Sequence, residues 1–437
     1  MTELVQEATD SQSFPIDDFK VAADQLDKHF PVKAGLLSRI FRGESDRAVR
    51  AVDDVTFGIK EGEAFGLAGE SGCGKTTLGK TLIRLLDPTD GDIYFDGKAI
   101  TDLDGSELKA YRREAQIIHQ DPYQSINPRF RVYRWVREPL DVHDIGTEEE
   151  RDARVYEVLE MAGLRPPDAY AQEYPTELSG GERQRVGIAR ALALGPSFLM
   201  ADEPASMLDV SIRASVLEVF ERLQSELGLT SLYISHDLSL LKHICDRIGI
   251  MYLGNLVEVG PADEIINDPK HPYTQALVSS VPRIDPREDR EQIELVGEVP
   301  DPIDVPSGCR FHPRCPKLVQ PSGYEFDQDD WRAVANLRYD LLDDDLILPE
   351  DIDDPTPEDV REHYEVPTPL DDREAEQVIS KALSQVMDDT EAEPNLNSLE
   401  SAFKSVCEEP GIGTYELSPT RRAMCVLYDE ELPGRPD

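Results

Sequence analysis

The sequence predicts an α/β domain built on a parallel sheet, followed by a smaller domain that contains cysteines. The chain has 437 residues, which exceeds one typical domain. Between about residues 21 and 265, apolar strand-like runs alternate with helical patterns, as the crossover helices of a parallel sheet require. From 266 onward, a proline-rich stretch leads to the segment GCRFHPRCP at 308–316. We therefore expect a mobile acidic N-terminus at 1–20, the α/β domain at 21–265, and a C-terminal domain at 266–437 with an acidic insertion at about 320–400.

Several elements of the first domain can be placed in order. The run AFGLAG (64–69) predicts a short buried strand that leads into a glycine-rich loop, and DIYFDGKAI (92–100) predicts a hairpin that turns at Asp96-Gly97. The segment TEEERDARVYEVLEMAG (147–163) predicts a helix that begins with a capping box of Thr147 and Glu150. FLMA (198–201) and SLYIS (231–235) predict buried strands.

The acidic insertion also contains helical patterns. Residues 341–400 hold 20 acidic and 3 basic residues, which is typical of a solvated segment. Nevertheless, WRAVANLRYDLL (331–342) and QVISKALSQVM (377–387) carry apolar residues at helical spacing. We expect both apolar stripes to pack against the host domain.

The net charge of the chain limits the kinds of partner that it can bind. The formal net charge is -43, from 88 Asp+Glu against 45 Lys+Arg, and only 13 of the basic residues are lysines. Such an acidic surface repels nucleic acid and anionic lipid headgroups. An ordinary protein with one acidic tail is the alternative, but the first domain is acidic too. The composition therefore favours a salt-loaded cytoplasm and a halophilic, haloarchaeal source.

No targeting or membrane segment is expected. The N-terminus MTELVQEATDSQSF has neither a basic region nor an apolar core, so no secretory signal is predicted. No apolar run approaches the roughly 18–20 residues that span a bilayer. Six cysteines in a cytosolic chain are expected to be free or ligating rather than paired in disulfides.

The glycine-rich loop has the pattern G-x-x-x-x-G-K-[ST], which predicts a phosphate-binding loop. Its backbone N–H groups turn inward around phosphates, and the helix that begins after it directs its positive end to them. Lys75 is expected to reach the β- and γ-phosphates of ATP, and the Thr76 hydroxyl is expected to ligate Mg²⁺. The ATP-binding residues predicted here are Gly69, Glu70, Ser71, Gly72, Cys73, Gly74, Lys75, Thr76 and Thr77.

The segment FLMADE (198–203) ends a buried strand in two carboxylates. We expect Asp202 to orient Mg²⁺ through water and Glu203 to act as the general base that polarises the attacking water. A solvated turn is the alternative for such a pair. Its position about 20 residues after LSGGE favours the catalytic interpretation.

The segment LSGGE at 178–182, followed by RQRVGIARAL, resembles the signature motif of ATP-binding cassette (ABC) ATPases, which is usually LSGGQ. The resemblance implies a P-loop ABC fold with a RecA-like parallel sheet core, an antiparallel β subdomain and a helical subdomain. It also implies a head-to-tail dimer in which Ser179, Gly180 and Gly181 bind the γ-phosphate held by the partner subunit. Here Glu182 stands where the motif usually has Gln.

The same resemblance assigns four further residues. Gln120 looks like the glutamine that ligates Mg²⁺ and senses the membrane subunits, and Asp209 resembles the D-loop aspartate. His236, directly after a predicted strand, looks like the switch histidine that contacts the γ-phosphate. Phe30 in KHFP is our choice for stacking on adenine; the alternatives are Phe41, because residues 31–48 look inserted, or an ordinary core aromatic.

Four longer segments are GLAGESGCGKTTLGKTLIRLLDPTDGDIYFDG, HQDPYQSINPR, PASMLDVSIRASVL and HPYTQALVSSVP. They resemble the oligopeptide/dipeptide (nickel) importer branch, and GCRFHPRCP resembles the C-terminal hallmark of that branch. The resemblance implies that four tail cysteines, Cys309, Cys315, Cys407 and Cys425, hold a [4Fe–4S] cluster. Tetrahedral zinc and free thiols remain alternatives. Cys73 is assigned no chemistry, and Cys245 is expected to be a core residue.

We therefore expect the ATP-hydrolysing subunit of a peptide importer, peripheral on the cytoplasmic face of the cell membrane. Its implied partners are a paralogous ATPase or a second copy, two membrane permeases and, through them, an extracellular solute-binding protein; no nucleic acid is expected. The alternatives are the ATPase of a nickel or sugar importer, a soluble ABC ATPase of DNA repair or translation, and a non-catalytic binding module. Lys75, Glu203 and His236 argue against the last of these.

Overall fold

The computed structural model describes residues 14–32, 47–121, 126–281, 292–293, 295, 297–343, 355–387 and 396–429. The chain divides into two compact units, Met1–Asp268 and Pro269–Asp437. Residues 14–20 of the segment predicted to be mobile are described and contain the 3-10 turn η1 (Ile16–Asp18), whereas residues 1–13 lie outside the described residues.

The central sheet of the first unit is largely parallel, as predicted. Its strands run in the order β10-β9-β3-β8-β7-β6. The pairs from β9 to β6 are all parallel, and only β10 pairs antiparallel with its neighbour β9. Residues of β3, β7 and β8 are all buried, which is typical of a sheet covered on both faces. The strands are β3 (Ala64–Ala68), β6 (Ala115–Ile118), β7 (Phe198–Asp202), β8 (Thr230–Ile234), β9 (Arg247–Tyr252) and β10 (Asn255–Pro261).

A second sheet of the first unit is antiparallel, in the order β2-β1-β4-β5. Asp96 (φ 49°) and Gly97 (φ 70°) connect β4 to β5, and positive φ at both turn positions is typical of a tight hairpin. The predicted hairpin is therefore confirmed. The strands are β1 (Val21–Pro31), β2 (Ala48–Ile59), β4 (Asp90–Phe95) and β5 (Lys98–Ala99).

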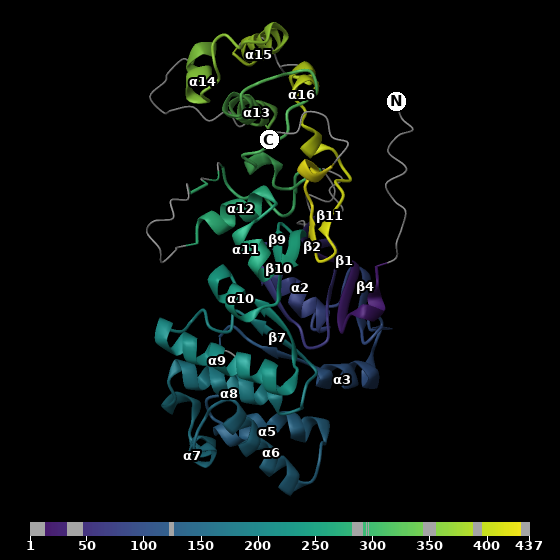
Figure 1. The fold of residues 1–437 in the computed structure, drawn as a ribbon, viewed down its shortest axis with the longest axis vertical. Coiled ribbons are helices and arrows are strands. Elements are labelled where there is room, and N and C mark those ends of the chain that lie inside the picture. Colours follow the sequence, from purple (N-terminus) through teal and green to yellow (C-terminus); the bar gives the residue numbers. More distant parts are fainter. Residues whose placement is uncertain are drawn as a thin grey trace, which may run out of the picture. The chain divides into compact units, whose positions relative to one another are not determined.

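Helices α5 to α9 gather at one end of the first unit (Figure 1). Helix α6 begins after Thr147 with the capping box to Glu150 that the sequence predicts. The helical elements of this unit are α2 (Lys75–Leu82), α3 (Gly105–Glu114), α5 (Val132–His143), α6 (Glu148–Met161), α7 (Pro167–Gln172), η2 (Pro175–Glu177), α8 (Gly180–Leu192), α9 (Val210–Leu227), α10 (Leu238–Ile244) and α11 (Ala262–Asn267).

The second unit has its own hydrophobic core, centred on Trp331 and Phe403. The two predicted apolar stripes form helices α13 and α15, and their apolar residues are buried in this core beside Leu318 and Val426 of the flanking tail. The stripes are thus packing faces, as expected. The elements are α12 (Pro272–Ser279), η3 (His312–Arg314), α13 (Gln328–Leu342), α14 (Pro357–His363), α15 (Arg373–Val386), α16 (Asn397–Ala402), η4 (Val406–Glu408), β11 (Tyr415–Ser418), β12 (Arg421–Ala423) and η5 (Val426–Tyr428).

Candidate functional site

The phosphate loop connects β3 to α2, and two of its glycines are required by their surroundings. Gly69 has a φ of +149° and Gly74 a φ of +108°. A Cβ atom would lie 2.1 Å from the Met251 carbonyl oxygen at the first position and 1.9 Å from that of Ala51 at the second. No other residue type fits these positions, so the loop keeps its backbone close to its neighbours. The Lys75 Nζ, which is buried, donates to the carbonyls of Gly69 and Glu70 at 2.8 Å each.

The chemically important side chains follow adjacent strands of the sheet. The loop follows β3, His236 follows β8, Asp202 ends β7 and Gln120 follows β6, and these four strands are neighbours. Because the carboxyl ends of parallel strands meet at one edge, the topology places the predicted residues together.

Thr76 and Asp202, which the sequence predicts as magnesium ligands, are in direct contact. The Thr76 hydroxyl donates to Asp202 Oδ1 at 2.8 Å. Burial raises the pKa of Asp202, and the nearby Glu203 raises it further, whereas the hydrogen bond from Thr76 opposes the shift. Two adjacent oxygen donors of this kind suit Mg²⁺, which arrives bound to the substrate ATP.

Glu203 lies between two other predicted residues. Its Oε2 accepts a hydrogen bond from Gln120 Nε2 at 2.9 Å, and its Oε1 lies 3.2 Å from His236 Nδ1. The φ of Glu203 is 45°, a conformation that non-glycine residues adopt mainly where the surroundings impose it. Its backbone N–H donates to Ile234 O at 2.9 Å, so the bend at the end of β7 is tied to β8.

A cavity of about 420 Å³ opens beside these residues. Its lining adds Lys80, His119 and Met207, which the sequence analysis missed. Lys80 could have been found from its position one helical turn after Thr76, and His119 from its place directly before Gln120. Burial lowers the pKa of His119, with Lys80 contributing, so its neutral form is favoured. Met207 is exposed, and only its apolar character next to LD (208–209) signalled a contact surface.

The signature residues begin α8. Ser179 caps this helix, and Glu182 completes a capping box by accepting hydrogen bonds from the Ser179 N–H at 2.8 Å and hydroxyl at 2.7 Å. Tyr170 also donates to Glu182, at 2.9 Å. The hydrogen bonds from Ser179 lower the pKa of Glu182. Glu182 is therefore a local cap, and Gly180 and Gly181 follow Ser179 in the first turn of the helix.

The D-loop aspartate lies close to the signature helix. Asp209 caps α9 by accepting from Ile212 N at 3.1 Å and from the Ser211 hydroxyl at 2.7 Å. A Cβ atom on Gly181 would lie 2.3 Å from Ile212, so the first turns of α8 and α9 are in close contact. Among the described residues, no hydrogen bond links Ser179 or Asp209 to the phosphate loop of the same chain.

Phe30 lies on β1 with 38% of its surface exposed, and Lys28 Nζ lies 5.1 Å from the ring centre. The adjacent His29 contacts Asp53 at 2.7 Å, and the N–H of Asp53 donates to Gly254 O at 3.1 Å. Gly254 in turn donates to Cys73 O at 2.9 Å, which connects the Phe30 strand to the phosphate loop. The alternative, Phe41, lies outside the described residues.

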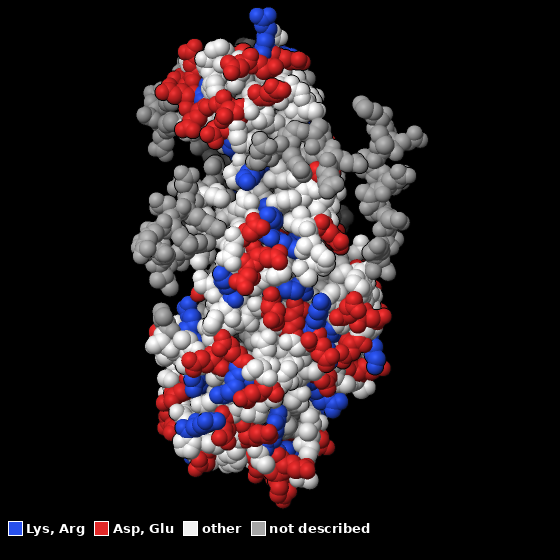
Figure 2. Space-filling view, in the orientation of Figure 1, with Lys and Arg blue, Asp and Glu red and all other residues white. Residues whose placement is uncertain are grey.

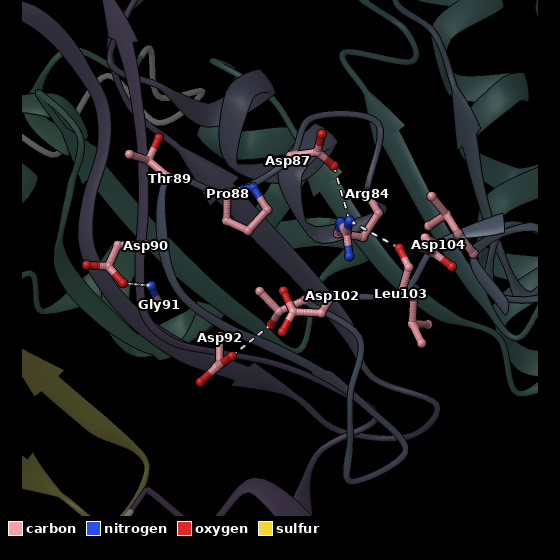
Figure 3. Close-up of a pocket in the computed structure, with 12 residues that line it drawn as sticks. Arg84, Asp87, Pro88, Thr89, Asp90, Gly91, Asp92, Asp102, Leu103 and Asp104 are labelled. Carbon is pink, nitrogen blue, oxygen red and sulfur yellow. Dashed lines mark hydrogen bonds and ion pairs between the residues drawn. The ribbon is translucent and has the colours of Figure 1, made fainter.

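Asp27, His29 and Asp53 form the one three-residue group of potential metal ligands within 4.8 Å among the described residues. The His29–Asp53 contact and the hydrogen bond from the Asp54 N–H to Asp27 at 2.6 Å already account for their arrangement. A different cavity, of about 730 Å³, is lined by Asp87, Asp90, Asp92, Asp102 and Asp104, with Arg84 paired to Asp87 at 3.1 Å (Figure 3). None of the predicted nucleotide ligands lines this acidic cavity.

The four tail cysteines gather in the second unit. Cys309 N donates to Cys407 O at 2.9 Å, and a Cβ atom on Gly308 (φ +68°) would lie 2.3 Å from that oxygen. Cys315, Cys407 and Cys425 are buried. Burial is the main cause that raises the pKa of the Cys309 and Cys315 thiols, and the charges of the other cysteines raise both further.

The four sulfurs do not form a compact group of the kind that surrounds a single metal ion. No three of these four described cysteines have sulfurs within 4.8 Å of one another. His271 Nε2, which the sequence analysis missed, lies 3.9 Å from Cys309 Sγ, and it stands in the proline-rich stretch that follows residue 266. Cys245 is buried at the end of α10, which confirms it as a core residue. Cys73 is buried beside Lys75 Nζ, at 3.7 Å.

Three regions of the chain match known families. Residues 52–206 match the ABC transporter family, residues 257–321 match the C-terminal region of oligopeptide/dipeptide transporters, and residues 328–416 match a domain of unknown function, DUF8228. None of the described helices is both long enough and apolar enough to span a bilayer.

Curated relatives match about two thirds of the chain. The chain is 50% identical over 286 residues to the putative oligopeptide transport ATP-binding protein YkfD of Bacillus subtilis, a match that covers 65% of this chain and 86% of that protein. It is 44% identical over 299 residues to the dipeptide transport ATP-binding protein DppF of Escherichia coli, covering 68% and 87%. The solved structure of cbiO1 from Clostridium perfringens, part of the ABC transporter complex cbiONQ, matches with a TM-score of 0.50 and 26% identity, covering 57% of this chain and 92% of that chain.

The parallel sheet, the phosphate loop and the residues at the ends of its strands define an ATPase of the ABC type. More narrowly, the chain belongs to the oligopeptide/dipeptide transport ATP-binding proteins of the ABC transporter family. The family predicted from the motifs is thereby confirmed.

Proposed function

We propose that this chain is the ATP-hydrolysing subunit that powers a peptide importer. The observation that carries the proposal is the position of Glu203, which lies between Gln120 and His236 and directly after the Asp202–Thr76 pair. This arrangement can bind MgATP and hold a water molecule for attack on the γ-phosphate.

Each residue has a role that its geometry supports. The loop amides and Lys75 would hold the phosphates, and Thr76, Asp202 and Gln120 would hold the Mg²⁺ that neutralises phosphate charge. Glu203 accepts the proton of the attacking water, and His236 fixes the carboxylate and contacts the γ-phosphate. Ser179 and Asp209 begin α8 and α9, whose first turns are in close contact, and by resemblance to the family they serve the nucleotide of a partner subunit. ATP binding then closes a dimer and hydrolysis reopens it.

The partners follow from the family. The chain works with two membrane permeases, peripheral on the cytoplasmic face of the membrane, and pairs with a paralogous ATPase or a second copy. A solute-binding protein delivers peptide through the permeases. Reconstitution with the permeases should give ATP hydrolysis that a dipeptide or oligopeptide stimulates, and Lys75→Ala should abolish both hydrolysis and uptake. Hydrolysis that responds to nickel or a sugar but not to peptide would refute the substrate class.

For the tail, we propose that Cys309, Cys315, Cys407 and Cys425 hold a [4Fe–4S] cluster. Neither Cys309 with Cys315 nor Cys407 with Cys425 has the C-x₂-C spacing that is usual in zinc sites. The spacing therefore favours a cluster, which takes four thiolates. Protein purified without oxygen should contain about four irons per chain. A preparation that contains one zinc, or no metal, would refute the cluster and leave the ATPase site unaffected.

We also propose that the protein works in a salt-loaded cytoplasm. Asp and Glu occupy more of the visible face than Lys and Arg in Figure 2, and the cavity of Figure 3 gathers five aspartates in one place. Like charges directly opposite on neighbouring strands, Asp24 with Asp92 and Asp27 with Asp90, destabilise a sheet unless ions screen them.

A further inference from the structure

The helical insertion lies between two segments that carry the tail cysteines. The first cysteine segment contains Cys309 and Cys315, and the second contains Cys407 and Cys425. The insertion contains α13 to α16, which lie within the region 328–416 that matches a domain of unknown function, and this match extends past Cys407. The chain enters it from the Cys315 loop and leaves it just before Cys407. Near the entry, Trp331 Nε1 donates to Leu318 O at 3.0 Å, and near the exit the Ser405 hydroxyl donates to Val319 O at 2.7 Å. Both ends of the insertion are therefore hydrogen-bonded to the short segment that follows Cys315.

One arginine of α13 binds the first cysteine segment. Arg332 donates from Nη1 to the carbonyls of His312 at 3.1 Å and Cys315 at 3.3 Å, and from Nη2 to that of Pro313. A single guanidinium thus holds the whole turn η3 that precedes Cys315. Among the described residues, no carboxylate pairs with Arg332.

A second arginine of α13 binds the other cysteine segment. Arg338 makes two parallel hydrogen bonds to Glu408, at 2.7 and 2.9 Å, with side chains only 3% and 9% exposed. Glu408 follows Cys407 and also accepts from Ser405 N at 2.9 Å. Two parallel bonds between charged groups fix orientation as well as distance. Through this ion pair, α13 fixes the position of the backbone at Cys407.

The two contacts differ in charge. The positive charge of Arg338 is neutralised by Glu408, whereas Arg332 meets only backbone oxygens. A partly buried cation without a carboxylate is costly unless another anion lies close to it. In a chain of net charge -43, the placement of this cation beside Cys315 indicates an anionic neighbour, and four thiolates supply one.

We propose that α13 of the insertion is the support of the four-thiol centre. Arg338 and Arg332 hold the two cysteine segments in position, and Arg332 in addition supplies positive charge to the anionic centre. Both are positioning residues. The charge part rests on the proposed cluster, whereas the positioning part concerns the protein with or without metal.

The test compares variants of the full chain, purified without oxygen. Arg332→Gln should lower the affinity for iron by about 10-fold or more, as loss of groups that orient metal ligands commonly does. It should also shift the reduction potential to more negative values, because a nearby positive charge stabilises the reduced, more negative state. Arg332→Lys should keep most of the potential and lose part of the iron affinity. Arg338→Glu with Glu408→Arg should restore the iron content that Arg338→Glu alone loses.

Arg361→Gln is the matched control. Arg361 is also a buried guanidinium of the insertion, and it pairs with Glu376 at 2.8 Å and with Pro367 O at 2.9 Å, away from the cysteines. It should leave the potential unchanged. Equal potentials and iron affinities in Arg332→Gln and Arg361→Gln would overturn the proposal.

Hydrogen exchange of the iron-free protein distinguishes the positioning role of the arginines from the charge role of Arg332. Arg338→Gln should speed exchange at residues 309–315 and 405–408, and Arg361→Gln should not. If wild-type protein binds no iron, the cluster and the charge role are refuted together, and the exchange result alone decides the positioning role. Unchanged exchange in Arg338→Gln would refute that role even where the cluster forms.

Discussion

Replacing Glu203 by Gln should reduce ATP turnover far more than a disturbed hydrogen bond can explain. The Gln side chain keeps one acceptor for Gln120 or His236, so at most one of the two contacts of Glu203 is lost. One such contact contributes about 0.5–1.5 kcal/mol, which is at most about a tenfold change in rate. Loss of a general base costs about 10²–10⁴-fold. A decrease of 100-fold or more therefore identifies Glu203 as the base.

The assay is single-turnover hydrolysis by the reconstituted transporter, with ATP binding measured in parallel. The Gln variant should bind ATP at least as well as the wild type and dimerise more stably. Glu221→Gln is the matched control, because Glu221 also contacts a histidine, His243, at 3.0 Å but lies outside the site. A decrease of tenfold or less in the Glu203 variant, or an equal decrease in the control, would refute the assignment.

Three further predictions concern the cap, the adenine contact and salt. Folding lowers the pKa of Glu182, so the carboxylate stabilises the fold fully above the ordinary pKa of 4.5 and loses this effect as pH falls through the lower pKa of the folded state. The Tm difference between wild type and Glu182→Gln should therefore shrink on acidification. A Tm difference that stays constant with pH would contradict this. Phe30→Ala should weaken ATP binding by about 1–3 kcal/mol in a titration, whereas Phe30→Tyr should not, and equal affinities in both variants would show that Phe30 does not stack. The Tm should rise with salt as the Debye length falls from about 30 Å at 0.01 M to about 3 Å at 1 M, and a flat Tm would contradict the halophilic assignment.

The ATP site could be predicted from the sequence because its residues follow strands. A loop of fixed glycine spacing, and carboxylates at the end of an apolar run, have local signatures that topology then brings to one edge of the sheet. The contact of Glu203 with both Gln120 and His236 was beyond prediction in detail, since it depends on the bend at Glu203 and its bond to β8. Glu182 likewise looked like a departure from a motif, and only the structure shows it as a cap.

The support of the cysteines could not be read from the sequence. Arg332 and Arg338 stand on a predicted helix, but their partners are backbone oxygens at 312–315 and a carboxylate far along the chain. Such partners have no periodic signature. The acidic composition of the insertion predicts a solvated face and gives no sign of the guanidinium groups on its inner side.

The hydrogen bond between Ser405 and Val319 has a consequence for the order of folding. The two residues are 86 positions apart in the chain. Bringing together the ends of a disordered loop of that length costs about 4 kcal/mol of chain entropy, beyond a constant term. Once the inserted helices have folded, that entropy is already lost. The two cysteine segments can then come together without a further entropic cost for closing the loop. Capture of the proposed cluster by the nascent chain should therefore be a late step, which waits for the helices to assemble after most of the protein has left the ribosome.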